Sequence, residues 1–368
     1  MAKTIVKSFR YRIYPTRRQA ETLNNQLAIC CELYNAALQE RRDAWKINGV
    51  SIRYESQTLQ LKEIKATRPD VAQINIYALE NVLKRVDKAF DGFFRRVKIK
   101  QAGYPRFKPT RRYDSLTLRR IGHALNGNEL RIPKVGSVKI KLHRPLEGKI
   151  KTLTIKREAG RWFAIFACEV EAVWLPSNSN TIGVDVGLAS FATLSTGEAV
   201  KNPRHYRQSE RRLRIAQRRV ARRKKGSNRR RKAVRLLQRI HAHVRAQRSD
   251  FHHKLSRRLV NENGLIAVED LNVKGLARTR LAKSIHDAGW SDFIFKLTYK
   301  AENAGRVLVK VDPRGTSQTC TCGVEVRKTL KDRLHICLNC GLVANRDHVS
   351  SQVILQRAVS LSGANVGS

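Results

Sequence analysis

The chain has 368 residues, of which 74 are Lys or Arg and 30 are Asp or Glu, so its formal charge at pH 7 is +44. Such a charge repels itself unless a polyanion neutralises it, and nucleic acid is the usual one. The sequence contains no apolar run of about 18 residues that could span a membrane, and its N-terminus lacks the apolar core of a secretory signal. We therefore expect a nucleic-acid-binding protein of two or three domains in the cytoplasm, associated with the nucleoid.

A strand followed by helices is predicted for the N-terminal part of the chain. Residues 3–14 alternate between polar and apolar side chains, which predicts a strand. Residues 15–100 contain two stretches with apolar side chains at helical spacing, so we predict a helical domain there. The second stretch has aromatic residues, which we interpret as core in preference to a platform for nucleobases. Its apolar face is Leu79, Val82, Leu83, Val86, Phe90, Phe93 and Phe94.

Short strands separated by Gly and Pro fill residues 101–174. This pattern predicts a small antiparallel β-barrel, to which residues 1–14 add a strand. Residues 175–180 are predicted to be a linker. From residue 181 onward strands alternate with helices, which is typical of an α/β sheet. The whole chain is therefore expected to be an α+β multidomain protein.

A strongly basic segment runs from Arg204 to Arg235, with sixteen Lys or Arg residues and a single acid, Glu210. Apolar residues recur at helical spacing on both sides of the sequence KKGSNRR. Residues 204–248 are therefore predicted to form two ordered helices, with one face on the core and the other against phosphates. A solvated face or a disordered arm is the alternative. The candidate nucleic-acid-binding residues are Arg211, Arg212, Arg218, Arg219, Arg222, Arg223, Lys224, Lys225, Arg229 and Arg230.

Three carboxylates lie in apolar surroundings. Asp185 lies in IGVDVG, Glu269 ends LIAVE, and Asp347 begins the predicted helix of NRDHVSSQVIL. A buried acid must be paired, hydrogen-bonded or bound to metal. Each acid alone could pair with an arginine, and Asp347 could simply favour the helix dipole. If the two strands pair and the helix packs on them, the three acids converge as ligands for Mg²⁺ or Mn²⁺. Two such ions about 4 Å apart would activate water for attack on a phosphodiester.

Four of the seven cysteines, Cys320, Cys322, Cys337 and Cys340, lie close together in the sequence. Two pairs separated by a hairpin-like stretch predict a four-thiolate zinc ribbon, and such clustering favours a reducing compartment over a disulfide scaffold. The first pair is C-x-C, one residue shorter than the usual knuckle, so we expect this half of the site to be distorted. His335 is the nearest substitute ligand, although we expect it to face solvent or to lie on the ribbon's strand.

The order of these motifs resembles the TnpB family, the transposon-encoded RNA-guided nucleases related to the type V CRISPR effectors. The resemblance is carried by IGVDVGLASFATLSTGE, IAVEDLNVKGLA, GWSDFIFKLTYKAENAGRVLVKVDPRGTSQTCTCG, CLNCG and NRDHVSSQVIL. The N-terminal FRYRIYPTRRQAETLNNQLAICCELYNAAL is also similar to the family's opening. The resemblance spans nearly the whole chain, and its C-terminal half is the most specific part.

The resemblance implies a RuvC-like (RNase H-like) nuclease domain over residues 181–319 and 342–368, with a zinc ribbon inserted over residues 320–341. The predicted barrel would be the family's wedge-like domain, and the predicted helical domain its recognition domain. The three acids match the family's catalytic triad, and the four cysteines match its zinc ligands. The implied activity is Mg²⁺-dependent cleavage of double-stranded DNA beside a short motif. A guide RNA from the transposon end would direct it. Separately, nothing in the sequence requires a dimer, so we expect a monomer.

Two departures from the family's pattern bear on activity. One is the shortened first knuckle. The other lies in the usual D-R-D-x-N-A-A motif, where Asn345 replaces the first acid and Val349 replaces the asparagine. Ser350 and Ser351 replace the alanines, and Asp347 retains the catalytic acid. A cleavage-deficient RNA-guided repressor that blocks DNA by occupancy is therefore one alternative. An RNase H-like transposase that joins DNA ends is the other, because it would use similar acids.

Overall fold

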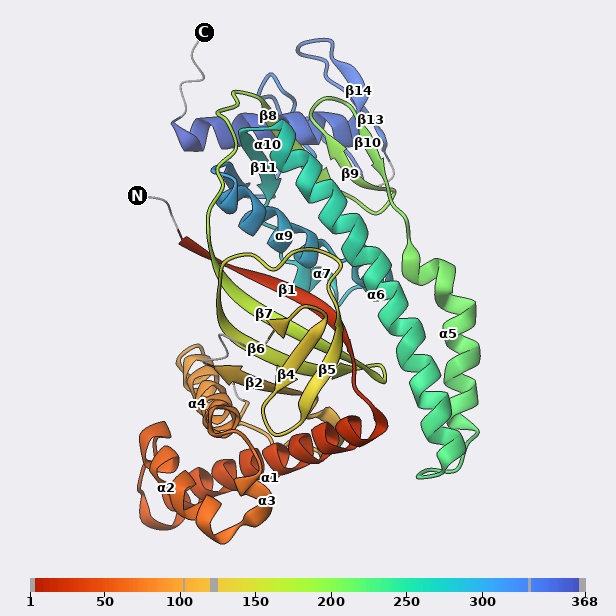
Figure 1. The fold of residues 1–368 in the computed structure, drawn as a ribbon. Coiled ribbons are helices and arrows are strands. Elements are labelled where there is room, and N and C mark those ends of the chain that lie inside the picture. Colours follow the sequence, from red (N-terminus) through yellow and green to blue (C-terminus); the bar gives the residue numbers. More distant parts are fainter. Residues whose placement is uncertain (1–3, 102, 120–124, 330–331, 364–368) are drawn as a thin grey trace. The chain divides into compact units, whose positions relative to one another are not determined.

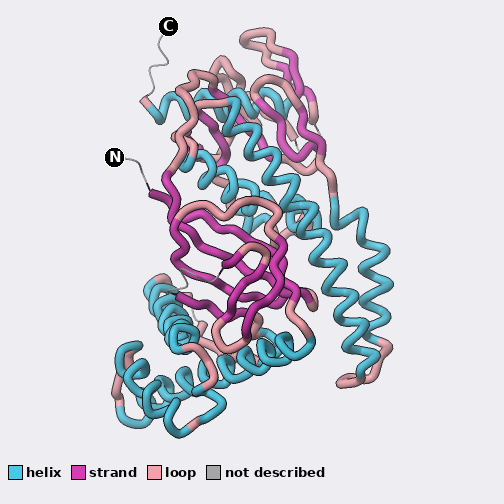
Figure 2. Tube along the Cα trace, viewed as in Figure 1, coloured by secondary structure: helices cyan, strands magenta, loops and turns pink. Residues whose placement is uncertain are grey.

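The computed structural model describes residues 4–101, 103–119, 125–329 and 332–363. The chain divides into two compact units, Met1–Glu171 and Ala172–Ser368 (Figure 1). Each unit contains its own sheet and its own helices (Figure 2), as the expected mixed α and β class requires. Among the helices of the described ranges, none combines the length and the apolar character that crossing a membrane requires.

The N-terminal unit is built on a seven-stranded antiparallel sheet. In the sheet the order is β2-β6-β7-β1-β5-β4-β3, so β1 lies between β7 and β5. The strand predicted near the N-terminus therefore belongs to the same sheet as those predicted after residue 101. The sheet curls, but within the described residues its edge strands β2 and β3 do not pair, so hydrogen bonds do not close it into a barrel. The strands are β1 (Thr4–Tyr14), β2 (Ser115–Arg119), β3 (Leu125–Asn126), β4 (Glu129–Ile132), β5 (Gly136–Lys141), β6 (Lys149–Glu158) and β7 (Arg161–Glu171).

Helices share one apolar core with this sheet. Thr16 caps the N-terminus of α1: its hydroxyl accepts a hydrogen bond from the Gln19 backbone, while the Gln19 side chain accepts one from the Thr16 backbone. This reciprocal pair satisfies two N–H groups that the first turn leaves without helical partners. The helical elements of the unit are α1 (Arg17–Asn48), α2 (Tyr54–Thr67), α3 (Pro69–Ala72), α4 (Ile76–Lys98) and a 3₁₀ turn (Thr110–Arg112).

The apolar face of α4 is buried in this core near the start of the helix and becomes exposed near the C-terminal end of the helix. Leu79 and Val86 are fully buried, as the sequence predicts, but Phe94 is 57% exposed. Phe90 and Phe93 are only partly buried. The prediction that the whole aromatic stripe belongs to the core is therefore wrong for its last turn, because α4 continues beyond the apolar surface that covers its first turns.

The C-terminal unit contains a five-stranded sheet in the order β10-β9-β8-β11-β12. The three strands β8, β11 and β12 run parallel, and β9 and β10 continue the sheet in antiparallel pairs. Parallel strands joined through helices match the α/β pattern predicted from residue 181. The strands are β8 (Thr181–Val186), β9 (Ser190–Leu194), β10 (Ala199–Lys201), β11 (Leu265–Glu269) and β12 (Val307–Val311).

Helices cover both faces of this second sheet. Ile182, Val184 and Val268 pack with α6 and α9, whereas Leu265 and Ala267 pack with α10 on the opposite face. A short hairpin, β13 (Leu334–Ile336) and β14 (Val343–Asn345), precedes α10. The helices are α5 (His205–Ala221), α6 (Asn228–Glu262), α7 (Val273–Leu276), α8 (Ala282–Ala288), α9 (Trp290–Asn303) and α10 (Arg346–Ser362).

Candidate functional site

Two of the three candidate acids lie at the carboxyl ends of neighbouring parallel strands. β8 and β11 pair in register through Val184 and Val268, and the next residues along the two strands are Asp185 and Glu269. The two valines point into the core shared with α6 and α9. Because successive side chains of a strand alternate between faces, both acids point to the opposite face, which α10 covers.

Close packing of α10 on β8 brings the third acid to the same face. Gly183 has no side chain, and a Cβ atom there would lie 2.0 Å from the Ser351 backbone oxygen and 3.0 Å from the Leu355 side chain. Asp347 is four residues before Ser351 and so lies on the same side of the helix. Asp185 is two residues after Gly183 and so lies on the same side of the strand. The glycine thus lets Asp347 approach Asp185.

Asp347 lies in the first turn of α10, where its backbone and side chain both have partners. The side-chain oxygen of Asn345 accepts a hydrogen bond of 2.9 Å from the Asp347 N–H and caps the helix. Asn caps a helix about as well as Asp, so this departure from the family motif preserves the cap. The Asp347 carboxylate accepts hydrogen bonds from Arg346 at 3.1 and 3.2 Å and forms an ion pair with Arg333 at 3.7 Å.

Burial and mutual repulsion shape the electrostatics of the three acids. Burial raises the pKa of Asp185 well above its usual value, and the charges of Glu269 and Asp347 raise it further. Burial also raises the pKa of Glu269, against a hydrogen bond from Thr316 that lowers it. Among the described residues, neither a hydrogen bond nor an ion pair to the Asp185 carboxylate is found. A half-buried acid without a partner, beside two like charges, is a setting that a bound cation would stabilise.

The spacing of the acids differs from that of ligands packed around one ion. In the part of the chain that the structure describes, only the four cysteines lie with all their ligand atoms within 4.8 Å of one another. The three carboxylates are therefore more widely spaced than the thiols. Ligands placed around two ions about 4 Å apart need not all approach one another so closely.

Two neighbours of the acids were not predicted. The Thr316 hydroxyl is buried and donates a 2.5 Å hydrogen bond to Glu269. A ring nitrogen of His348 lies 3.2 Å from the Ser195 backbone oxygen, which connects the first turn of α10 to the end of β9. His348 could have been suspected because it directly follows Asp347. Thr316 gave no such signal, because only the fold brings it to Glu269.

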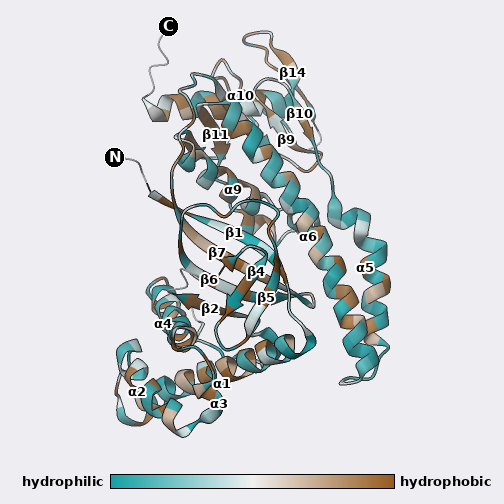
Figure 3. Cartoon of the chain, viewed as in Figure 1, coloured by the Kyte–Doolittle hydropathy of each residue, from teal (hydrophilic) through white to brown (hydrophobic). Residues whose placement is uncertain are grey.

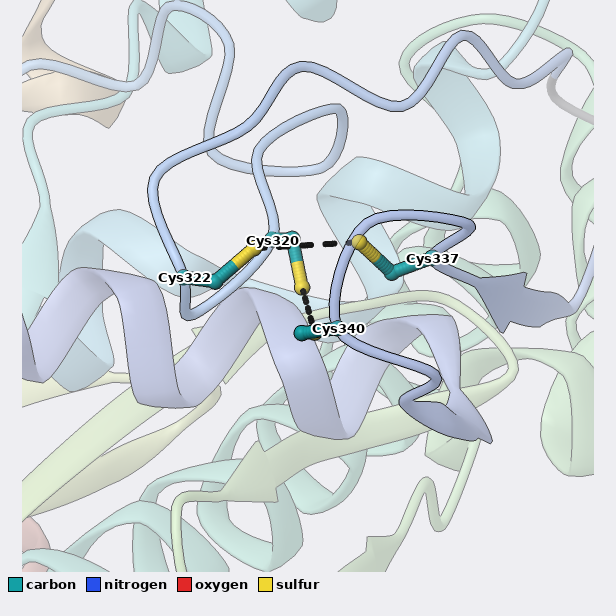
Figure 4. Close-up of side chains that lie close together, drawn as sticks. All are labelled: Cys320, Cys322, Cys337 and Cys340. Atoms are coloured by element: carbon teal, nitrogen blue, oxygen red, sulfur yellow. Dashed lines mark hydrogen bonds between the residues drawn. The ribbon is translucent and has the colours of Figure 1, made fainter.

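The four cysteines form a compact cluster in which the sulfur atoms point towards one another (Figure 4). Two sulfur–sulfur distances are 3.6 Å, between Cys320 and Cys340, and 3.7 Å, between Cys322 and Cys337. A tetrahedral zinc ion with Zn–S bonds of about 2.3 Å requires sulfur–sulfur distances of about 3.8 Å. The donor set and its spacing therefore fit a metal ion.

Both halves of the cluster close in similar tight turns, although the first is one residue shorter. The Gly323 N–H donates to the Cys320 backbone oxygen, and the Gly341 N–H donates to the Cys337 backbone oxygen, each at 2.9 Å. Both glycines have positive φ, 90° and 74°, which residues with a side chain rarely adopt. The C-x-C pair thus turns its sulfurs to the same centre as the C-x-x-C pair.

The thiols have unequal proton affinities. A backbone hydrogen bond from Val324 is the main cause that lowers the pKa of Cys322 to about 6, and one from Cys340 is the main cause that lowers the pKa of Cys337. The pKa of Cys340 is raised to about 12: the backbone of Leu342 lowers it, but the neighbouring thiols, Cys337 first, raise it more. Four thiolates so close together repel one another, and a divalent cation would remove that repulsion.

His335 lies on β13, which is one of the two predicted positions, and is fully buried. Its Nδ1 lies against the Lys328 ammonium group. The other prediction, that it faces solvent, is wrong. The cysteines form the metal-ligand cluster without it.

The basic segment forms the hairpin of α5 and α6, which Figure 3 shows largely in the teal of hydrophilic residues. Leu213, Ala216 and Ile240 hold the two helices together. Eight of the ten candidate binding residues are exposed, and Arg223 and Arg230 are half-buried. Arg230 donates hydrogen bonds to the backbone oxygens of Val220 and Arg223 at 3.2 and 3.1 Å, so it closes the end of α5.

Three family models match the chain. The model described as "Probable transposase" matches residues 166–280, "Cas12f1-like, TNB domain" matches 290–354, and "Helix-turn-helix domain" matches 1–49. The second range contains the cysteine cluster. Within the last range, described residues 4–49 form β1 and the single long helix α1. This segment therefore matches the helix-turn-helix model in sequence but does not fold as two helices joined by a turn.

Two relatives and one solved structure match the chain over most of its length. The chain is 35% identical to a "Putative RNA-guided DNA endonuclease" of Streptomyces pristinaespiralis, over 100% of this chain and 93% of the relative. It is 27% identical to "Putative RNA-guided DNA endonuclease InsQ" of Escherichia coli, over 86% and 83% of the two chains. The fold is similar to that in "Cryo-EM structure of the Cas12f1-sgRNA-target DNA complex", with a TM-score of 0.62, 14% identity and coverage of 95% and 98%.

Proposed function

The chain belongs to the TnpB family, and on that premise we propose that it is an RNA-guided DNA endonuclease whose active site is formed by Asp185, Glu269 and Asp347. The observation that carries the proposal is that two of these acids lie on one face of the sheet and the third lies on α10, which packs against that face. Burial and the charges of Glu269 and Asp347 together raise the pKa of Asp185. Its full-length relatives carry the name of RNA-guided DNA endonucleases. The five-stranded sheet with α10 is then the RuvC-like nuclease domain.

The three acids fit divalent cations, because a half-buried carboxylate without a hydrogen bond lies beside two others. Mg²⁺ or Mn²⁺ bound there would supply an activated water and stabilise the leaving oxygen of a phosphodiester. Thr316 orients the Glu269 carboxylate through its hydroxyl. Arg346 and Arg333 hold the Asp347 side chain and add positive charge where a phosphate would approach.

In this proposal, sequence choice comes from base pairing of a guide RNA, and the protein binds the nucleic acids through their phosphates. The exposed Arg and Lys side chains of the α5–α6 hairpin are the candidate phosphate contacts, which makes binding strongly dependent on salt. The guide derives from the transposon end, and the target is double-stranded DNA beside a short motif. The sheet of the N-terminal unit corresponds to the wedge-like domain, and helices α1 to α4 correspond to the recognition domain.

The four cysteines would hold a structural zinc ion in this proposal. Two sulfur–sulfur distances match a tetrahedral site, and backbone N–H groups favour the thiolate form at Cys322 and Cys337. The cluster directly precedes β14 and α10, so zinc would anchor the segment that leads into Asp347. The zinc ribbon is thus assigned the role of a support for the third acid.

A cleavage-deficient repressor is the second candidate, and one observation favours it. The Asp347 carboxylate is held by two arginines, which compete with a metal ion for its oxygens. A plasmid carrying the target, incubated with the protein, its guide RNA and Mg²⁺, separates the candidates. Linear product supports the endonuclease, bound but intact plasmid supports the repressor, and strand-transfer products support a transposase.

The assignment of the acids is tested by Asp185→Ala in the same assay. Loss of this ligand is expected to reduce cleavage at least about a thousandfold while guide and target binding persist, because the acids act on the chemical step. Asp250→Ala removes an exposed acid of α6 that pairs with Lys254 and should cleave as the wild type does. Substantial cleavage by Asp185→Ala would refute the assignment.

A further inference from the structure

A groove with aromatic and basic walls lies in the N-terminal unit, and the proposed cleavage chemistry does not use it. Its volume is about 460 Å³, within the range of roughly 300–1,000 Å³ for ligand sites in proteins. One wall comes from α1 and the other from the segment that follows α4. The lining residues are Leu38, Arg42, Tyr104, Pro105, Arg106 and Phe107.

Two aromatic rings line the wall that follows α4, Tyr104 and Phe107, and the rings of α4 support Tyr104. The Tyr104 ring packs in T-shaped pairs with Phe90 and Phe93, with centroids 5.7 and 5.2 Å away, and the Phe94 ring lies 5.2 Å from that of Phe93. Tyr104 is 42% exposed, Phe94 57% and Phe107 47%. The neighbouring rings thus hold Tyr104 in a fixed orientation while it still faces solvent, and exposed aromatic side chains gathered in this way typically mark a binding site.

The segment that carries Tyr104 and Phe107 is strongly cationic. From Phe93 to Arg112 the sequence contains eight Lys or Arg residues and neither Asp nor Glu. The Arg42 guanidinium lies 5.3 Å from the centre of the Phe107 ring, and its Nε donates a 2.8 Å hydrogen bond to the neighbouring Asp43. Arg96 donates a 2.7 Å hydrogen bond to the Gly103 backbone, which ties the aromatic segment to α4.

We infer that this groove binds unpaired nucleotides of single-stranded RNA or DNA, with a base stacked on Tyr104 or Phe107 and phosphates near Arg42 and Arg106. Flat apolar rings among cations complement a polyanion whose bases expose their faces. In a duplex those faces are hidden by stacking, so a paired strand would gain only the phosphate contacts. The inference goes beyond the proposed function, because it concerns a surface outside the carboxylate site and requires no cleavage.

The test is binding of single-stranded oligonucleotides that carry 2-aminopurine, whose fluorescence is quenched when the base stacks. The full-length protein is used with EDTA, so the result is independent of metal and of cleavage. Ribo- and deoxyribo-oligonucleotides form two arms, and the duplex of the same sequence forms a third. Phe107→Leu and Tyr104→Leu are each expected to weaken single-strand binding about tenfold. The salt dependence should stay unchanged, because the substitutions remove no charge.

Control variants separate stacking from folding. Phe107→Tyr keeps a ring and should bind as the wild type does, whereas Phe295→Leu, which changes a ring of α9 that is 67% exposed, should have no effect. Weaker binding by Phe107→Leu and Tyr104→Leu of only the RNA or only the DNA oligonucleotide would support the inference and show which nucleic acid the groove binds. Unchanged affinity of Phe107→Leu and Tyr104→Leu in both arms would overturn it. An equal loss of duplex binding, or failure of Phe107→Tyr to retain binding, would overturn it as well.

Discussion

The carboxylate site and the cysteine cluster both gather like charges, but they form in different ways. The cysteines come from two short turns close together in the sequence, and local hydrogen bonds point their sulfurs at one another. The acids come from β8, β11 and α10, and only strand pairing and helix packing bring them to one face. Short turns can therefore fix ligand distances closely, whereas the carboxylate site depends on the packing of α10 against the sheet.

Removing the proposed zinc should have the largest effect on folding. The purified protein is expected to contain one zinc ion per chain by elemental analysis. Cys337→Ser should lose it and destabilise the C-terminal unit by at least about 3 kcal/mol in urea unfolding, because binding of a structural metal is part of the folding free energy. Cys168→Ser, which changes a buried thiol of the other unit, should keep its zinc. The prediction would be contradicted if the wild-type protein without zinc were as stable as the wild-type protein with zinc.

Gly183→Ala should weaken the packing on which the carboxylate site depends. The added methyl group meets the Ser351 backbone oxygen at 2.0 Å, so α10 must shift. We expect a loss of about 2–3 kcal/mol in unfolding free energy together with slower cleavage. Gly92→Ala is the matched control, because there the methyl group meets only the end of the Arg96 side chain, and helix propensity should give a gain of up to about 1 kcal/mol. Equal stability of Gly183→Ala and the wild type would argue against close packing.

Asn345 offers a smaller test of the same helix. Asn345→Ala removes the cap of α10 and should cost about 1 kcal/mol of stability. Asn345→Asp restores the acid of the family motif and should leave stability nearly unchanged, because both side chains cap well. If both variants are equally unstable in thermal unfolding, the Asn345 side chain does more than cap the helix.

Substitutions in the basic hairpin of α5 and α6 should have the smallest effects, and they distinguish a residue that binds nucleic acid from one that stabilises the fold. Arg229 is exposed, so Arg229→Ser should reduce the slope of log affinity against log salt by about 0.9 for each phosphate that the side chain neutralises without changing stability. Arg230 holds the end of α5, so Arg230→Ser should instead destabilise the protein by about 1 kcal/mol. Both are measured by salt-dependent nucleic-acid binding and thermal unfolding. A larger decrease in salt dependence for Arg230→Ser than for Arg229→Ser would reverse this assignment.

Several features could be predicted because they depend on neighbours in the sequence. Helical spacing predicted α5 and α6 around their basic turn, and the apolar run before Glu269 predicted β11. The predicted strand near the N-terminus exists as β1. Periodicity shows which face of an element is apolar, but not how far the core that covers it extends. Periodicity alone therefore places Phe94 in the core, although it faces solvent.

By itself the sequence determined the family, the basic character and the cysteine cluster. Charge, motif order and short ligand spacing do not depend on which distant segments of the chain come into contact. Only the tertiary structure decided that Asp185 and Glu269 share a face, that Gly183 admits α10, and that Thr316 reaches Glu269. It also decided that Arg230 serves the fold. These relations depend on strand register and helix packing between segments far apart along the chain, which no local pattern specifies.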